Sequence, residues 1–187
     1  MNTQENRFLQ AALRYAARGW SVIPLRAKEK KPAISSWMQY QTERADEATI
    51  REWWSRFPEA NVGLVTGAVS GIIVLDVDGP EGRASLEKIT GRFGALPATP
   101  QSSTGKGSHY LFRHPGGDLR NFAKRGINLD FRGDGGYIVA PPSIHPNGGT
   151  YQWEQNPEDV APADPPAWLL ELLTNEQIPG WFDELFQ

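Results

Sequence analysis

Three segments of this 187-residue chain alternate polar and apolar residues as a β-strand with one buried face does. They are residues 71–79, 108–114 and 127–133. Because alternate residues of a strand point to the same side of a sheet, each segment presents its polar residues together. These residues are Asp76 and Asp78, His109 and Arg113, and Asn128, Asp130 and Arg132. If the three strands are neighbours, one face gathers three carboxylates, a histidine and two arginines.

Such a face has a chemical use. Crowded carboxylates repel one another, and their ionised form is favoured only when a cation lies among them. Oxygen ligands select Mg²⁺ or Mn²⁺, and the absence of cysteine makes a zinc site less favourable. Two such ions can clamp the attacking and leaving oxygens of an in-line phosphoryl displacement. Histidine and arginine on the same face suit a triphosphate, as does the Gly105-Lys106-Gly107 segment, although TGKG is not a P-loop.

Each of these features is ambiguous alone. An Asp-x-Asp at the end of a strand also occurs in glycosyltransferases and in phosphatases that use aspartate as a nucleophile. Asp78, followed by Gly-Pro, is equally compatible with the start of a turn. A lone strand histidine is commonly structural, and Asp130 with Arg132 is compatible with a surface ion pair. The joint occurrence favours metal-dependent phosphoryl chemistry.

The elements that must position these residues follow from hydrophobic periodicity and turn signals. Helices come early in the chain and strands come late, so we expect an α/β or α+β fold with a mixed or antiparallel sheet. The expected helices cover residues 6–18, 42–57, 81–93 and 167–173, and the expected strands lie within 20–25, 61–67, 70–79, 102–115, 126–133 and 135–143.

Charge is distributed unevenly along the chain. Residues 133–187 hold nine of the 22 acidic residues and no lysine or arginine, so residues 1–132 carry 19 basic and 13 acidic residues. The first two-thirds is therefore compatible with a polyanion such as nucleic acid, although a solvated surface explains the same charges. No membrane-spanning run or signal-peptide pattern occurs, and the absence of cysteine fits the reducing cytoplasm.

A series of motifs in a fixed order resembles one known family, the bifunctional DNA primase/polymerase (Prim-Pol) domain of the archaeo-eukaryotic primase superfamily. The motifs are YAARGWSVIPL (15–25), KKPAISSW (30–37), WW…P.ANVGLVTG (53–67), SGIIVLDVD (70–78), GSHYLF (107–112) and LDFRGDGGYIVAPPSIH (129–145). The resemblance implies an RRM-like catalytic sheet with an N-terminal αβ segment packed against it. We expect a catalytic domain over 1–154, divided into 1–67 and 68–154, and an acidic connector with a helical tail over 155–187.

The same resemblance implies the roles of site residues. Asp76 and Asp78 form the first metal-binding motif, and Asp130 is the third acid, which completes the metal site. His109 contacts the phosphates of the incoming nucleotide, and Ser108 beside it is a further nucleotide-binding residue. The superfamily's second motif often reads Ser-x-His, which departs from this arrangement. A literal Ser-x-His occurs at 143–145, but it follows the third acid, so His109 is preferred.

The implied reaction is template-directed nucleotidyl transfer on single-stranded DNA with nucleoside triphosphates and two Mg²⁺ or Mn²⁺ ions. Such domains serve the replication of plasmids, phages and mobile elements. Phosphate contacts are expected from Lys106, Arg113 and Arg132. Template contacts are expected from Lys30, Lys31, Arg120, Lys124 and Arg125, with solvated lysines as the alternative at 30–31.

The end of the chain lies outside these motifs. Family members commonly continue into a helical domain and a helicase, which is therefore a candidate partner. Residues 178–186 have helical apolar spacing, which predicts docking on the chain's own domain or, less readily, recruitment of a clamp or single-strand-binding protein through 175–187. Two other functions stay open: a metal-dependent phosphatase or sugar transferase that uses the Asp-x-Asp, and a non-catalytic scaffold that binds single strands.

Overall fold

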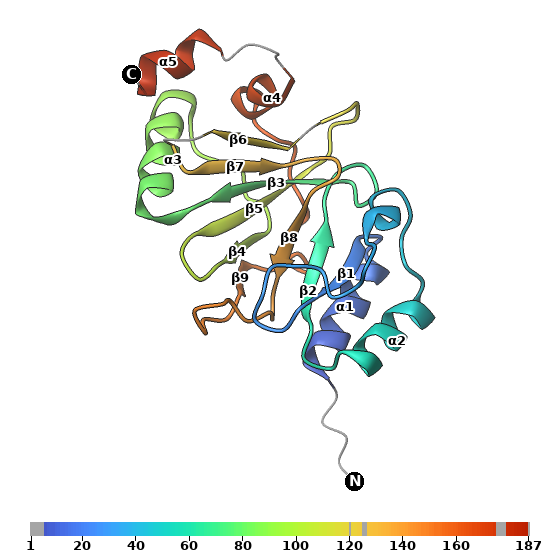
Figure 1. Ribbon diagram of the computed structural model, residues 1–187. Helices are drawn as coiled ribbons and strands as arrows, with labels where there is room; N and C mark the ends of the chain where they lie inside the picture. Colours follow the sequence, from blue (N-terminus) through green and yellow to red (C-terminus); the bar gives the residue numbers. More distant parts are fainter. Residues whose placement is uncertain (1–5, 120, 125–126, 175–178, 187) are drawn as a thin grey trace.

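The computed structural model describes residues 6–119, 121–124, 127–174 and 179–186, which form an α+β fold with two sheets (Figure 1). The described strands form one sheet of order β1-β2-β8 and a second of order β6-β7-β3-β5-β4-β9. All strand pairs within the described residues are antiparallel, so the expected fold class is confirmed in its antiparallel form.

The smaller sheet and two helices form the N-terminal part of the fold. The strands are β1 (Ser21–Leu25), β2 (Asn61–Val65) and β8 (Tyr137–Ala140); the helices are α1 (Arg7–Ala17) and α2 (Glu47–Arg56), with a 3₁₀ turn, η1 (Met38–Gln41). Asn6 caps α1, whose Phe8 and Tyr15 are buried. Helix α2 starts later than the periodicity predicts, because the Asp46 carboxylate accepts the Thr49 N–H (2.8 Å) and fixes the first turn.

The larger sheet has two different faces. Its strands are β3 (Ile72–Val77), β4 (Gln101–Ser103), β5 (Ser108–Arg113), β6 (Phe122–Lys124), β7 (Leu129–Arg132) and β9 (Gln152–Gln155). Ile73, Leu75 and Val77 pack in one core with α3 (Gly79–Phe93), α4 (Ala167–Thr174) and α5 (Gly180–Phe186). The opposite face carries Ile72 and Val74, which join the core of the N-terminal part. The polar residues of that second face therefore lie next to the smaller sheet.

Strands β7 and β8 are close in sequence but belong to different sheets, so the segment between them links the two halves (Figure 1). Asp134 holds this link. Its carboxylate accepts backbone N–H groups from Ala68 and Leu119, each at 2.8 Å, and lies 3.3 Å from His114 Nε2. Three loops are thereby fixed around one buried corner.

The C-terminal helix packs on α3 of the same chain. Trp181 and Phe182 are buried, the Trp181 ring lies 4.8 Å from that of Phe93, and Arg92 pairs with Glu184 at 2.7 Å. Docking on the chain's own domain, one of the two expectations for this segment, is therefore confirmed for α5, and the apolar face expected to recruit a partner is covered. Residues 175–178 lie outside the described residues. No helix in the described part of the chain is long and apolar enough to cross a membrane.

Candidate active site

The strand register brings the predicted polar residues of three strands side by side. In β3, Asp76 is directly opposite His109 of β5 on one side and Asp130 of β7 on the other. Directly paired residues project to the same face, so the two carboxylates and the histidine form a row across the centre of the larger sheet. The expectation that the three strands are neighbours is confirmed.

His109 is neutral at physiological pH. It is 5% exposed, and its burial, followed by the positive charges of Lys30 and Arg132, lowers its pKa to about 3. Its Nδ1 lies 3.5 Å from Ser102 Oγ, and its Nε2 lies 3.5 Å from Asp76 Oδ1. If Ser102 donates to Nδ1, the ring carries its proton on Nε2, which faces the carboxylate row. The site thus has a neutral N–H donor beside its acids.

The carboxylates of the row destabilise one another's charge. Burial, reinforced by the charge of Asp78, raises the pKa of Asp76 to about 6, although Arg132 and Lys30 oppose the shift. Burial also raises the pKa of Asp130, whose Oδ2 accepts a hydrogen bond from Arg132 Nη2 at 3.0 Å. An added cation between these groups would relieve the repulsion.

Asp78 follows β3 and precedes α3. Its backbone N–H donates to the Asn128 carbonyl (2.9 Å), while its exposed side chain makes no capping hydrogen bond to the helix. Its charge acts on both Asp76 and Asp130. The carboxylate of Asp78 is therefore close enough to the row to act on its charges, and it makes no hydrogen bond to the helix.

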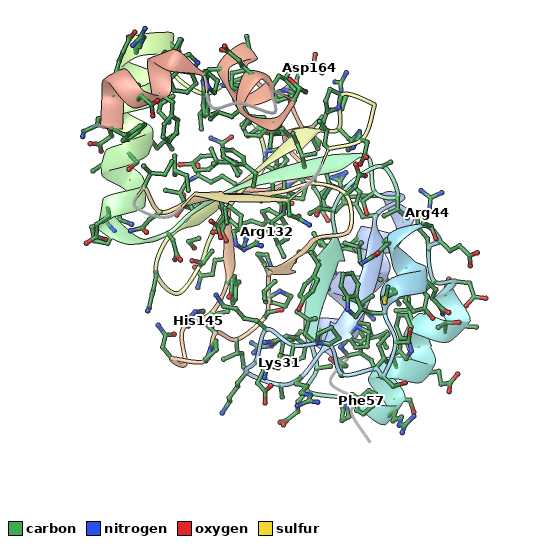
Figure 2. The ribbon with its side chains drawn as sticks, turned by 45° about the horizontal axis from the view of Figure 1, so that its top comes forward. Lys31, Arg44, Phe57, Arg132, His145 and Asp164 are labelled. Carbon is green, nitrogen blue, oxygen red and sulfur yellow. The ribbon has the colours of Figure 1, made fainter. Side chains whose placement is uncertain are left out.

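A cavity of about 300 Å³ opens above the row, between the two sheets. Its charged and aromatic lining residues are Lys30, Asp76, His109, Arg132, Tyr137 and Tyr151, and the backbone of Gly135 and Gly136 completes one wall. Figure 2 shows Arg132 near the middle of the molecule, with His145 and Lys31 below it on separate loops. The cavity therefore combines one acid, two cations, a neutral histidine and two tyrosines, while Asp78 and Asp130 lie outside its lining.

A second, more open hollow lies beside Asp78. It is lined by Arg83 of α3, Lys106 and Asn128, together with the first residues of α3. Lys106 therefore lies beside Asp78, in this hollow rather than in the cavity, and its contact with phosphate stays a prediction. Arg83 was not predicted, since its position on a helix surface carries no periodic signal.

Two predicted phosphate ligands lie elsewhere. Arg113 is at the far end of β5, opposite Ile72, and pairs with Asp164 at 3.3 Å on the surface. Ser108 is opposite Val77 and so projects to the other face of the sheet from His109. The structure therefore places neither side chain in the lining of the cavity, and contacts of Arg113 and Ser108 with phosphate stay predictions.

The basic loops give a mixed result. Lys30 lines the cavity, whereas Lys31 is exposed and does not. Arg120 and Arg125 lie outside the described residues, and so does the side chain of Lys124, although its backbone belongs to β6. Template contacts by these residues stay predictions.

The glycines of the TGKG segment have a packing role. A Cβ on Gly107 would overlap the Val77 carbonyl of β3, and a Cβ on Gly105 would meet the His145 ring. His145 also organises the 145–149 turn, in which its N–H donates to the Gly149 carbonyl at 2.7 Å. The glycines therefore allow a close approach of backbone and ring, a reason other than the expected contact with phosphates.

The carboxylates of this site are suited to a particular kind of metal ion. Among the residues that the structure describes, no three His, Asp or Glu side chains form a group that could hold a metal ion by themselves. The donor set nevertheless suits Mg²⁺ or Mn²⁺, because such ions usually take one or two carboxylates and complete their shell with water and substrate phosphates. The mutual repulsion of Asp76 and Asp78 supports the same fit.

Comparison with known families agrees with the fold. The sequence profile described as "Bifunctional DNA primase/polymerase, N-terminal" matches residues 12–168, most of the chain. The chain therefore belongs to the Prim-Pol family, which implies a nucleotidyltransferase-type enzyme and suggests DNA primase/polymerase activity. A domain of this kind binds DNA and nucleotides. No curated protein matches the chain.

Three residues that line the cavity were missed by sequence reasoning, namely Asn121, Tyr137 and Tyr151, and so was Ser102, which contacts His109. Tyr137 begins a predicted strand, but nothing in the sequence shows that β8 leaves the larger sheet and faces it. Tyr151 follows a turn and precedes a strand that was not predicted. Only the folded chain brings them to the acids.

Proposed function

We propose that this chain catalyses template-directed nucleotidyl transfer on single-stranded DNA, as a primase, a DNA polymerase or both. The observation that carries the proposal is the row formed by Asp76, His109 and Asp130 beneath a polar cavity, in a Prim-Pol domain. In the reaction, a 3′-hydroxyl of the primer or first nucleotide attacks the α-phosphate of an incoming nucleoside triphosphate. The α–β phosphoanhydride bond breaks and pyrophosphate leaves.

The residues of the cavity have distinct roles in this proposal. Lys30 and Arg132 bind the negatively charged phosphates, and the neutral His109 donates its Nε2 proton to a phosphoryl oxygen. A neutral donor is useful here, since it orients a phosphate without competing with a metal for the carboxylates. Lys106 and Arg83, in the hollow beside Asp78, face the side from which the second substrate approaches.

Asp76, Asp78 and Asp130 would hold the Mg²⁺ or Mn²⁺ ions. When bound, these ions would lower the pKa of the attacking hydroxyl and neutralise the charge of the leaving group. To bind a metal ion, Asp130 must give up part of its hydrogen bonding with Arg132. Arg132 is then free to contact phosphate, so one rearrangement would prepare both groups.

The test is a nucleotide-incorporation assay with a single-stranded template, all nucleotides, one of them labelled, and Mg²⁺ or Mn²⁺. Parallel reactions contain a primer or omit it. The parent chain is compared with Asp76→Ala/Asp78→Ala and, as a matched control, with Asp164→Ala, whose carboxylate is on the surface beside Arg113. Template-dependent products from the parent and the control, but not from the double variant, support the proposal.

Other results distinguish the alternatives. Products without a primer add primase activity to polymerase activity. Hydrolysis of phosphate monoesters or sugar transfer without template, abolished by Asp76→Ala, would support the phosphatase or sugar-transferase function instead. No incorporation despite single-strand binding that survives Asp76→Ala would support the scaffold.

A further inference from the structure

Tyr151 has a buried ring whose hydroxyl is not used by the protein. The residue is 2% exposed and lines the cavity. Its backbone N–H donates to the Ser143 carbonyl at 2.9 Å, but its hydroxyl has no hydrogen-bond partner within the described residues. No fully buried polar side-chain atom of the described part lacks a partner, so this hydroxyl must retain access to the cavity.

The ring is held firmly in its position. It lies nearly parallel to the His109 ring, with centroids 6.2 Å apart, and the His145 ring lies 5.8 Å from it. Ile23, Leu25 and Val139 of the smaller sheet pack in the same core. The hydroxyl therefore has a fixed place beside His109, as a recognition group requires.

Tyr137, the other tyrosine of the cavity, is different. Its hydroxyl donates to the Lys30 carbonyl at 2.9 Å, and its ring makes an edge contact with Trp37 at 4.9 Å. The Tyr15 hydroxyl, far from the cavity, is likewise paired: it donates to the Pro141 carbonyl at 2.6 Å. The hydroxyls of these two tyrosines are thus paired within the described part of the protein, whereas the hydroxyl of Tyr151 is not.

The charges around the cavity show which part of a nucleotide would reach each tyrosine. Arg132 acts on the Tyr137 hydroxyl, whereas Asp76 and Asp78 act on the Tyr151 hydroxyl. The reacting α-phosphate belongs at the acids and the β- and γ-phosphates at the cations. The sugar is attached to the α-phosphate, so it too lies on the side of the acids, which is the side of the Tyr151 hydroxyl.

We propose that the Tyr151 hydroxyl recognises a sugar hydroxyl of the incoming nucleotide and thereby sets the preference between ribo- and deoxyribonucleotides. The inference rests on the proposed function of the cavity. A hydroxyl both donates and accepts, so it pairs with an alcohol of the sugar. A nucleotide without that alcohol leaves the Tyr151 hydroxyl without a protein partner, and such a site discriminates against it.

The experiment measures sugar selectivity in Tyr151→Phe, which removes one oxygen and keeps the ring. Binding of ribo-, deoxyribo- and dideoxyribonucleoside triphosphates with one base is measured by titration calorimetry in the presence of Mg²⁺, and kcat/KM is measured for the same nucleotides. Tyr137→Phe is the matched control, since its hydroxyl bonds to the protein. We expect Tyr151→Phe to change the affinity ratio between two of these sugars by about fivefold to tenfold, and Tyr137→Phe to leave the ratios unchanged.

Three outcomes would overturn the inference. Equal loss for all three sugars would assign Tyr151 to a part of the nucleotide that they share, such as the phosphate chain. Unchanged ratios in a folded Tyr151→Phe protein would remove it from recognition altogether. If the parent binds no nucleotide, both proposals fail. Sugar-selective binding without incorporation would refute only the proposed reaction and leave the role of Tyr151 in place.

Discussion

Two histidines, one within strand β5 and one directly after it, form two histidine–aspartate pairs with opposite properties. His109, within β5, lies 3.5 Å from Asp76, and His114, directly after β5, lies 3.3 Å from Asp134. Both histidine side chains are less than 10% exposed. The pairs therefore have similar chemistry and similar burial, and they differ in what surrounds them.

The Asp134 pair is saturated with hydrogen bonds. Burial alone would raise the pKa of Asp134, but the N–H groups of Ala68 and Leu119, together with His114, lower it overall. His114 Nδ1 accepts the Gly116 N–H at 3.0 Å, which leaves Nε2 as the donor to the carboxylate. This carboxylate is thus stabilised in its charged form.

The Asp76 pair lacks such support. Burial and the charge of Asp78 raise the pKa of Asp76, and its contact with His109 is long. The pair faces a cavity, whereas the Asp134 pair faces backbone. A histidine beside an aspartate thus stabilises the fold when hydrogen-bond donors surround the carboxylate. Where those donors are missing, the pair remains able to bind a ligand or take part in a reaction.

The largest expected effect is that of Asp76→Asn on activity. We expect nucleotide incorporation to fall by about 10³-fold or more, because the substitution removes the central carboxylate of the row. The measurement is kcat/KM for a primed template.

The same variant should be more stable than the parent in metal-free buffer at pH 8. The folded pKa of about 6 exceeds the ordinary value of 3.8, so ionisation of Asp76 opposes folding at neutral pH, by roughly 2–3 kcal/mol. This gain should shrink as the pH falls through 6 toward the unfolded pKa of 3.8, below which the parent carboxyl is protonated in both states. Urea unfolding at several pH values measures it, and a loss of stability at pH 8 would contradict the assignment.

A smaller effect is expected for His109→Ala. Loss of a neutral donor to a charged phosphate should weaken nucleotide binding by about 10- to 100-fold. Glutamine at the same position retains an N–H donor and should recover part of the loss. Because burial holds the pKa of His109 near 3, the parent's pH–rate profile between pH 5 and 9 should contain no inflection that His109→Gln abolishes. Disappearance of an inflection in that variant would show that the histidine is charged during the reaction.

Asp134→Asn should act on stability instead. An amide nitrogen cannot accept, so one backbone N–H, of Ala68 or Leu119, loses its partner, at a cost of about 2 kcal/mol. The folded pKa of Asp134 is lowered, so its contribution is complete above the unfolded pKa and is lost as the pH falls through the folded value. The difference in the free energy of unfolding between the parent and the variant should therefore become smaller as the pH falls. At low temperature, nucleotide incorporation per folded molecule should stay close to that of the parent. A loss of kcat without a loss of stability would show that Asp134 contributes to the reaction.

The contrast also shows what the sequence could predict. The alternation of Asp76, His109 and Asp130 with apolar residues predicted their common face, because the pleat of a strand is a local property. The types of most helices and strands followed from local periodicity as well. Strands β4, β6 and β9 were not predicted: each has only three or four residues and is defined by its pairing with a neighbour.

The parts that sequence reasoning missed depend on contacts between distant segments. Asp134 is flanked by glycines, a pattern typical of a turn. Its carboxylate nevertheless accepts hydrogen bonds from loops 15 and 66 residues away in the chain. Tyr151 reaches the cavity only because β9 pairs with β4 beside β5. Neither arrangement leaves a periodic signal.

The smallest expected effect belongs to Arg113, which shares strand β5 with His109 and was predicted to bind phosphate. Its guanidinium pairs with Asp164 at 3.3 Å, and both side chains are more than 60% exposed. Exposed pairs contribute about 0–1 kcal/mol and are screened by salt, so Arg113→Ala should change the free energy of unfolding by less than about 0.5 kcal/mol at 0.15 M salt. Because the residue lies opposite Ile72, at the end of β3 away from Asp76, the KM for nucleotide should not change, whereas Arg132→Ala should raise it. A KM increase in Arg113→Ala comparable to that of Arg132→Ala would mean that the phosphate chain extends along the whole of β5. The end of β5 near His114 would then belong to the active site, and the contrast between the His109–Asp76 and His114–Asp134 pairs would not hold.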